Sequence, residues 1–161
     1  MHRTPPRSLR TAHGFTLIEV VVAVAIVGII AAVAIPTFAD SMRKSRRSDA
    51  YAALSAVQQA QERWRANNAA YTANLTAAPG DDPPGLGLPA STARGYYTVT
   101  LDATSATGYT ALATATAGTT QANDGNCVRL RLRMAAGNVF YGSAAAAGAF
   151  DESADNRCWV R

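Results

Sequence analysis

The sequence predicts an α+β protein in which one long N-terminal helix packs on an antiparallel sheet of three or four strands, with a disulfide loop at the C-terminus. An apolar run occupies residues 15–35, and an amphipathic helical pattern follows it. Short segments of alternating polarity begin at residue 96. The 161 residues are enough for one domain with a modest core and an appended segment.

The apolar run, FTLIEVVVAVAIVGIIAAVAI, contains 21 residues. As a helix it would extend about 31 Å, close to the hydrocarbon thickness of a bilayer. Basic residues flank both ends, in the stretch RKSRR at 43–47 and before the run at Arg3, Arg7 and Arg10. The positive-inside rule therefore leaves the orientation of a spanning helix open.

Glu19 interrupts the apolar run. A charged side chain in a membrane segment costs roughly 2.5–3.5 kcal/mol at the centre and less near an end, so it is expected to have a partner. Two architectures leave it without one. One is a Sec signal peptide cut after Ala34, since Ala32-Val33-Ala34 fits that cleavage pattern. The other is an uncleaved signal anchor.

The stretch GFTLIE, residues 14–19, resembles the type IV prepilin processing motif, in which a short basic leader ends in glycine. The resemblance implies that a prepilin peptidase cuts between Gly14 and Phe15 and that Phe15 is then N-methylated. It also implies that Glu19 pairs with the N-terminal amine of a neighbouring subunit, which makes both charges tolerable in lipid. Pro36 fits the same pattern, where it implies a kink or a locally melted stretch; otherwise it would end the membrane helix.

These patterns divide the chain into five parts. They are a leader at 1–14, a transmembrane or fibre-core helix at 15–36, an amphipathic helix at 37–71, a connecting loop at 72–95 and a sheet with a disulfide loop at 96–161. Apolar side chains between Ala50 and Trp64 recur at helical spacing, and we expect this helix to end near Asn67 or Asn68. The connecting loop holds four prolines and four glycines, so it is expected to be irregular.

Strand and turn signals mark four segments, at 96–102, 109–117, 127–134 and 139–142. The clearest alternation is CVRLRLRM at 127–134. Its apolar side chains point to one face, and its three arginines, Arg129, Arg131 and Arg133, point to the other.

Cys127 and Cys158 are the two cysteines of the chain. Two cysteines without a histidine cannot form a four-ligand zinc site. In an exported domain the expectation is a disulfide that closes a loop of about 30 residues, worth about 3–4 kcal/mol on the chain-entropy estimate. The alternative is a pair of buried free thiols in a cytosolic protein.

Two groups of basic residues are candidate nucleic-acid contacts. The first is the run of Arg43, Lys44, Arg46 and Arg47, and the second is the arginine set Arg129, Arg131 and Arg133. Alternate residues of a strand lie about 6.5–7 Å apart, near the spacing of successive phosphates. The alternatives are a solvated collar beside a membrane, and an exposed sheet face whose arginines pair with acids such as Asp102.

The composition contains no evident enzyme constellation. His2 and His13 lie in the leader, so a processed chain would lack histidine, the usual general base and metal ligand. Without the leader, twelve basic residues face eleven acids, so net charge says little about partners. Asp151, Glu152 and Asp155 are a weak candidate for calcium and more typical of a solvated loop. We expect no cofactor, metal or catalytic site.

The head of the chain resembles minor pilins that carry a YYT first strand, here at 96–98, and a late Cys-Trp pair, here Cys158-Trp159. That group includes pilus receptors for DNA uptake. The resemblance implies a minor type IV pilin that assembles with other pilin subunits after prepilin peptidase cleavage. It would lie in the inner membrane with a periplasmic head and then in an extracellular pilus. The alternatives are a DNA-binding pilin for uptake, a type II secretion pseudopilin and a Sec-exported periplasmic domain.

Overall fold

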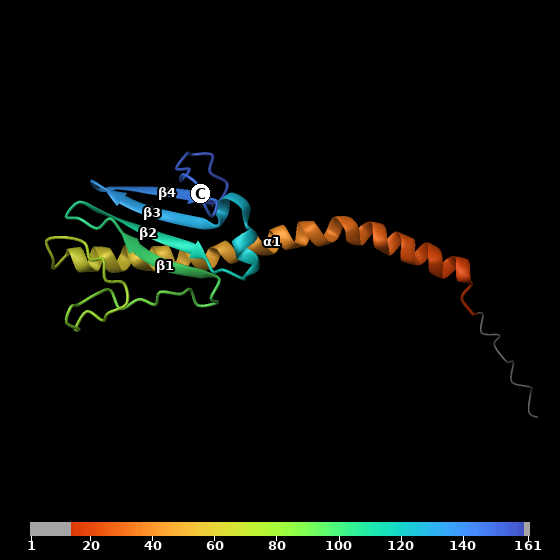
Figure 1. Cartoon of the computed structure of the whole chain (residues 1–161), viewed down its shortest axis with the longest axis horizontal. Helices are drawn as coiled ribbons and strands as arrows, with labels where there is room; N and C mark the ends of the chain where they lie inside the picture. Colours follow the sequence, from red (N-terminus) through yellow and green to blue (C-terminus); the bar gives the residue numbers. More distant parts are fainter. Residues whose placement is uncertain (1–13, 160–161) are drawn as a thin grey trace, which may run out of the picture. The chain divides into compact units, whose positions relative to one another are not determined.

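The computed structural model describes residues 14–159, so the predicted leader lies outside the described residues apart from Gly14. The chain forms two compact units, of which the first ends at Phe38 and the second begins at Ala39. Helix α1 (Leu17–Arg65) contributes residues to both (Figure 1). The two units are described separately, and the second is called the head.

The first unit consists of the apolar part of α1 and the residues just before it. Its large apolar side chains are exposed, since none of the described residues of this unit, 14–38, covers them. Pro36 lies inside α1, so the alternative in which it ends the helix is wrong. The hydroxyl of Thr37 donates to the carbonyls of Val33 (3.1 Å) and Ala34 (3.0 Å), beside the turn in which Pro36 offers no N–H.

In the head, α1 presents a buried apolar stripe at Ala50, Leu54, Val57 and Ala60, which confirms the predicted amphipathic helix. The helix ends at Arg65, two or three residues earlier than predicted. The side-chain amide of Asn68 donates to the carbonyl of Trp64 at 2.9 Å. This side-chain bond takes the place of a further helical bond, so the chain turns away.

Four strands form one antiparallel sheet, the upper end of the predicted number. They are β1 (Tyr97–Asp102), β2 (Gly108–Ala115), β3 (Arg129–Ala135) and β4 (Asn138–Ala144), in the spatial order β1-β2-β3-β4. Two short 3-10 helices, η1 (Thr120–Asn123) and η2 (Gly125–Cys127), connect β2 to β3. Every strand therefore pairs with its neighbour in sequence (Figure 1).

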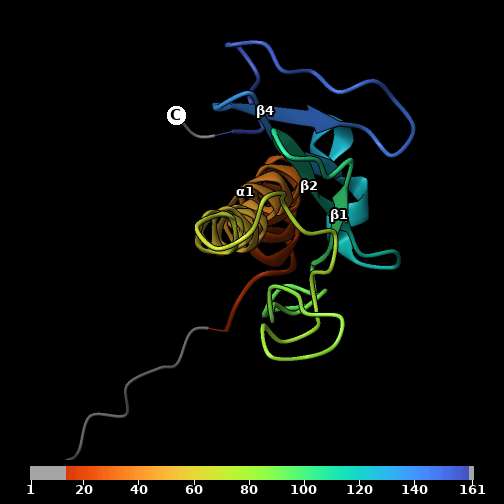
Figure 2. The same ribbon diagram turned by 90° about the vertical axis from the view of Figure 1, so that its left-hand side faces the viewer.

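The inner face of the sheet packs on α1 and forms the core of the head. Within the head, Figure 2 shows α1 on one face of the sheet and the C-terminal segment, in blue, beside β4. The largest fully buried apolar side chains come from both layers: Tyr97, Tyr109, Leu54, Leu130, Leu132 and Val57. Fixed burial of alternate strand residues sets the register, because a shift by one residue would turn the apolar set outward.

The connecting loop at 72–95 is irregular, as its prolines and glycines predict, apart from a single bridge between Ser91 and Thr98. Gln61 of α1 fastens its start. Its buried amide donates to the carbonyl of Thr72 at 2.7 Å and accepts from the Thr72 N–H at 3.2 Å. Both polar ends of this fully buried side chain are thereby satisfied.

Candidate functional site

The residues of the predicted processing motif lie at the beginning of the first unit. Gly14 and Phe15 precede α1, and Phe15 is 84% exposed. Glu19 lies in the first turn of α1, where its carboxylate complements the positive end of the helix, and its N–H donates to the Thr16 hydroxyl at 3.3 Å. By length and composition this helix could cross a membrane, with a mean hydropathy of 2.9 over its most apolar window.

The basic run at 43–47 belongs to the head and is not uniformly solvated. Arg43 pairs with Asp40 one turn earlier, and Lys44 is exposed. Arg46 holds its guanidinium 4.5 Å from the ring centre of Tyr96 and donates to the hydroxyl of Thr120.

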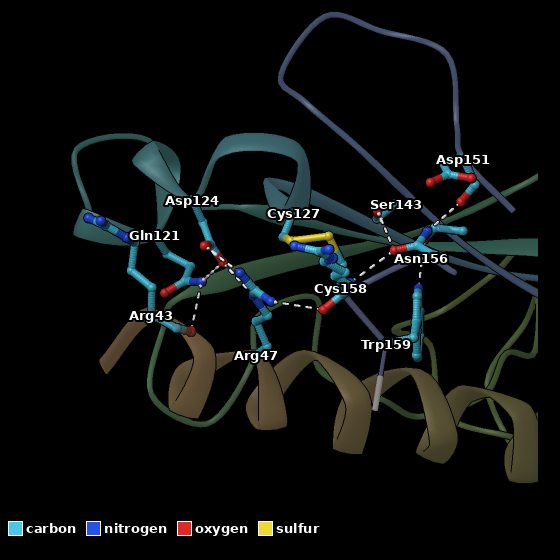
Figure 3. Close-up of a disulfide and its surroundings, with 12 residues drawn as sticks. Arg43, Arg47, Gln121, Asp124, Cys127, Ser143, Asp151, Asn156, Cys158 and Trp159 are labelled. Atoms are coloured by element: carbon cyan, nitrogen blue, oxygen red, sulfur yellow. Dashed lines mark hydrogen bonds and ion pairs between the residues drawn. A yellow bond between two sulfur atoms is a disulfide. The ribbon is translucent and has the colours of Figure 1, made fainter. Parts of the chain in front are cut away.

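Arg47 is buried, so the expectation of a solvated collar is wrong at this position. Its Nε and Nη2 each donate to the Asp124 carboxylate at 2.7 Å, and only 11% and 5% of the two side chains are exposed. The Asp124 carboxylate also accepts from Gln121 Nε2 at 2.6 Å (Figure 3). The bond to Asp124 raises the pKa of Arg47 because it stabilises the charged guanidinium. Arg47 therefore joins α1 to the turn before β3.

The disulfide between Cys127 and Cys158, predicted from the sequence, lies beside this ion pair (Figure 3). Arg47 Nη1 reaches the carbonyl of Arg157 at 3.5 Å, so one guanidinium contacts both segments that the disulfide links. The ring of Trp159 stacks on Tyr51 of α1, with ring centres 4.9 Å apart. The end of the described chain is thus held against the helix.

Asn156 makes a second connection in the same region. Its Oδ1 accepts from the Ser143 hydroxyl at 3.1 Å and from the Cys158 N–H at 2.9 Å. Its Nδ2 donates to the carbonyl of Asp151, which also pairs with Ser143 in an isolated bridge (Figure 3). The C-terminal segment is therefore fixed to the end of β4 by backbone and side-chain bonds together.

We call the outward set on β3, Arg129, Arg131 and Arg133, the arginine ladder. The predicted alternation is confirmed, since the apolar residues between these arginines are buried on the inner face. The guanidiniums face residues 145–152, which we call the strap. Arg129 donates to the carbonyls of Ala145 (2.9 Å) and Gly148.

The other two arginines share one carboxylate. Arg131 donates to Glu152 Oε1 at 2.7 Å, and Arg133 donates to both Glu152 oxygens at 3.1 and 2.7 Å. The expectation of pairing with Asp102 is wrong, because Thr110 of β2 lies between Asp102 and Arg133 in the sheet register. The hydrogen bond from Arg133 holds the pKa of Glu152 below its usual range.

The three acids at the C-terminus do not converge on one point. The Glu152 carboxylate is bound to arginines, and Asp151 accepts from the Ser153 N–H at 2.9 Å. Among residues 14–159, no group of three or more His, Cys, Asp or Glu side chains is placed to hold a metal ion.

The partners of the basic candidate residues could not be predicted from the sequence. Asp124 has the pattern of a turn residue and lies 77 positions from Arg47, so no local spacing connects the two. In the sequence Glu152 stands among acidic neighbours, and no local pattern links it to Arg131 and Arg133, which lie 21 and 19 positions away. Phe150 and Asn156 carried no signal.

The architecture is that of a type IV pilin: a long N-terminal helix with an apolar first part, an antiparallel sheet and a C-terminal disulfide. Residues 9–35 match the prokaryotic N-terminal methylation motif. Residues 36–131, more than half of the chain, match the family described as type IV minor pilin ComP, DNA uptake sequence receptor. The chain belongs to this family, which is one of structural pilins.

Several curated relatives are major pilins. The chain is 42% identical over 60 residues to the type IV major pilin PilA of Myxococcus xanthus, 34% over 84 residues to PilE1 of Neisseria gonorrhoeae, and 36% over 69 residues to the wide-pilus component PilA4 of Thermus thermophilus. These alignments cover 37%, 52% and 43% of this chain and 27%, 36% and 53% of the relatives. The chain therefore spans less than two thirds of the length of each of these relatives.

Proposed function

We propose that this pilin is a minor filament subunit whose head is a receptor for DNA. The match to the ComP family over residues 36–131 carries the proposal, since that family is described as a DNA uptake sequence receptor. The matched range contains most of the head, including the basic run of α1 and the first two strands. In this proposal the chain spans the inner membrane once, with the head in the periplasm, before it joins the filament.

The first unit supplies the filament part of the function. Cleavage between Gly14 and Phe15 would leave an amine one helical turn from Glu19. The apolar side chains that α1 exposes between Phe15 and Pro36 would then pack against other subunits or lipid. A carboxylate in that environment is favourable only beside a cation, so Glu19 would pair with the amine of a neighbouring subunit and favour assembly.

The basic run supplies the first DNA contacts. Among the described residues, neither Lys44 nor Arg46 forms a salt bridge, and both lie on α1 within the matched range. Arg46 lies against the ring of Tyr96, a cation–aromatic pair that keeps its guanidinium at the surface. Arg47 is excluded from this role by its burial against Asp124, and Arg43 is engaged by Asp40.

The test is duplex DNA binding by the full processed chain in detergent, followed across a series of salt concentrations. Each phosphate contact contributes about 0.9 to the slope of log affinity against log salt. Replacing both Lys44 and Arg46 by glutamine is expected to weaken binding and reduce the slope by about 2. The control replaces Arg63 and Arg65, at the opposite end of the helical part of the head. Equal loss of affinity in both double variants would contradict the proposed site. Near 50 mM salt a protein that makes about six phosphate contacts binds DNA well, so a wild type that retains no DNA at this concentration would contradict the proposed function.

A further inference from the structure

All three guanidiniums of the arginine ladder are occupied by the strap of the same chain. Arg129 donates to two strap carbonyls, while Arg131 and Arg133 share the Glu152 carboxylate. The ladder itself is a straight consequence of strand geometry, because alternate residues of β3 point to the same face about 6.5–7 Å apart. A row of cations at this spacing suits the successive phosphates of a nucleic acid strand.

The Glu152 carboxylate lies where a phosphate bound by the ladder would place its oxygens. It bridges Arg131 and Arg133 through one oxygen each at 2.7 Å, and a second bond from Arg133 measures 3.1 Å. Guanidiniums bind carboxylates and phosphates through the same forked arrangement of donors. Gly142 of β4 makes room for it: a Cβ at this position would lie 3.1 Å from Glu152 Cγ.

The ring of Phe150 lies over two guanidiniums of the ladder, those of Arg131 and Arg129, where a nucleic acid base could stack. Its ring centre lies 4.0 Å from the guanidinium carbon of Arg131 and 4.9 Å from that of Arg129. Aromatic bases stack on guanidinium planes in the same way. The Nε of Arg131 is buried and has no hydrogen-bond acceptor among the residues that the structure describes, so this arginine retains a donor that the strap does not use.

The strap is fixed at both ends, where it leaves β4 after Ala144 and where Asp151 returns to Ser143, and between them it is held to the ladder by the two bonds from Arg129. Asp151 pairs with Ser143 through backbone bonds of 3.0 and 2.8 Å, and the disulfide follows seven residues later. The stretch between Ser143 and Asp151 includes AAAGA at 145–149, which has only small side chains and is largely exposed. The Glu152 side chain is 23% exposed, so rotation about its own bonds carries it into solvent without moving Asp151.

We propose that the arginine ladder is a phosphate-binding track for DNA, and that the strap competes for it, with Glu152 in the place of a phosphate and Phe150 in the place of a base. The inference rests on the proposed DNA-receptor function. DNA and the strap exclude each other: a bound strand takes the three guanidiniums while Glu152 and Phe150 turn outward and the carbonyls of residues 145–148 move off Arg129. The strap lies outside the residues that match the ComP family, so this competition belongs to the C-terminal part of this chain.

The test compares Glu152→Gln with Asp155→Asn in the full processed chain in detergent. Both changes remove one negative charge from the same segment, but only Glu152 contacts the ladder. Anisotropy of a labelled duplex of about 20 base pairs gives affinity and salt slope. We expect Glu152→Gln to bind about three- to tenfold tighter, with a slope steeper by about 1–2, and Asp155→Asn to match the wild type.

Two further variants separate competition from a general effect of charge. Gly142→Ala pushes the Glu152 side chain aside without changing charge, and it is expected to strengthen binding in the same direction. Adding Arg131→Gln and Arg133→Gln to Glu152→Gln is expected to abolish the gain. Thermal unfolding of each variant, recorded beside the binding, shows that the head remains folded at the assay temperature.

Three outcomes would overturn the inference. Equal affinity of Glu152→Gln and Asp155→Asn, with a wild type that binds DNA, would refute the competition and leave the DNA-receptor function intact. Weaker binding by Glu152→Gln would mean that the strap is part of the DNA surface. Failure of the wild type and of all variants to bind would refute the proposed function itself, and the competition with it.

Discussion

Replacing Arg47 by methionine would leave the Asp124 carboxylate buried beside α1 without its cation. Methionine keeps most of the aliphatic stem of the arginine, so the change isolates the loss of charge from the loss of packing. The exposed fractions of the two side chains are 11% and 5%, so water does not replace the lost bonds. Gln121 Nε2, at 2.6 Å, would be the one remaining side-chain donor to this carboxylate among the described residues.

The structure sets the size of the effect. Removing one partner of a buried ion pair costs about 3–5 kcal/mol, most of it the penalty of the charge left behind. For a head of this size, each kcal/mol lowers the melting temperature by roughly 4 °C, so the variant is expected to melt about 10–20 °C below the wild type. Replacing both partners, Arg47→Met with Asp124→Asn, is expected to recover part of this loss because no unpaired charge remains.

The assay is thermal and urea unfolding of the full chain in detergent with the disulfide intact, followed by near-ultraviolet circular dichroism. Lys44→Met is the matched control, since it removes a cation from the same run of α1 at an exposed position. The control is expected to unfold within about 0.5 kcal/mol of the wild type. A loss below about 1 kcal/mol for Arg47→Met would refute the inference that this pair fixes α1 to the sheet.

Three further predictions concern other features of the chain. Replacing Cys127 and Cys158 together by serine is expected to cost about 3–4 kcal/mol on the chain-entropy estimate, measured by urea unfolding; wild-type stability would show that Asn156 and the ion pair suffice. Glu19→Val, compared with Val20→Ala, is expected to leave the protein in the membrane and absent from sheared filaments, and normal incorporation would exclude the register pairing. Since the pKa of Glu152 is lowered on folding, its contribution is complete above the unfolded value of about 4.5 and disappears as pH falls through the folded value. The melting-temperature difference between wild type and Glu152→Gln should therefore be constant near neutral pH and shrink as pH falls through the lowered folded pKa of Glu152, and a difference that stays unchanged throughout the acid range would contradict the ion pairs.

Much of the fold could be predicted because its signals are local. Alternation along β3 and the apolar stripe of α1 each depend on residues within one element, and burial of one face enforces them. The helix end was placed two or three residues late because side-chain capping by Asn68 competes with a further helical bond. Pro36 does not interrupt α1, since its φ angle suits a helix even though one hydrogen bond is lost.

The candidate site was predictable only in part. The basic residues were found by type and spacing, but their availability depends on contacts between distant segments. Arg47 meets Asp124 across 77 residues, and Arg133 meets Glu152 across 19 residues and a strand turn. Such pairs follow from how the elements pack, which no periodicity encodes. The sequence therefore indicates where cations lie on each element, and the fold decides which of them can meet a ligand.

The most direct test of the central claim, that this chain is a processed filament subunit, is the mass and N-terminal residue of the protein extracted from the membranes of the cells that produce it. The account predicts an N-methylated Phe15, which places Glu19 one helical turn from the amine it is expected to meet in a neighbouring subunit. An N-terminus at Ile35 would mean that Glu19 leaves with a signal peptide, and an intact Met1 would mean that the chain is only anchored. Either of these results would contradict the account.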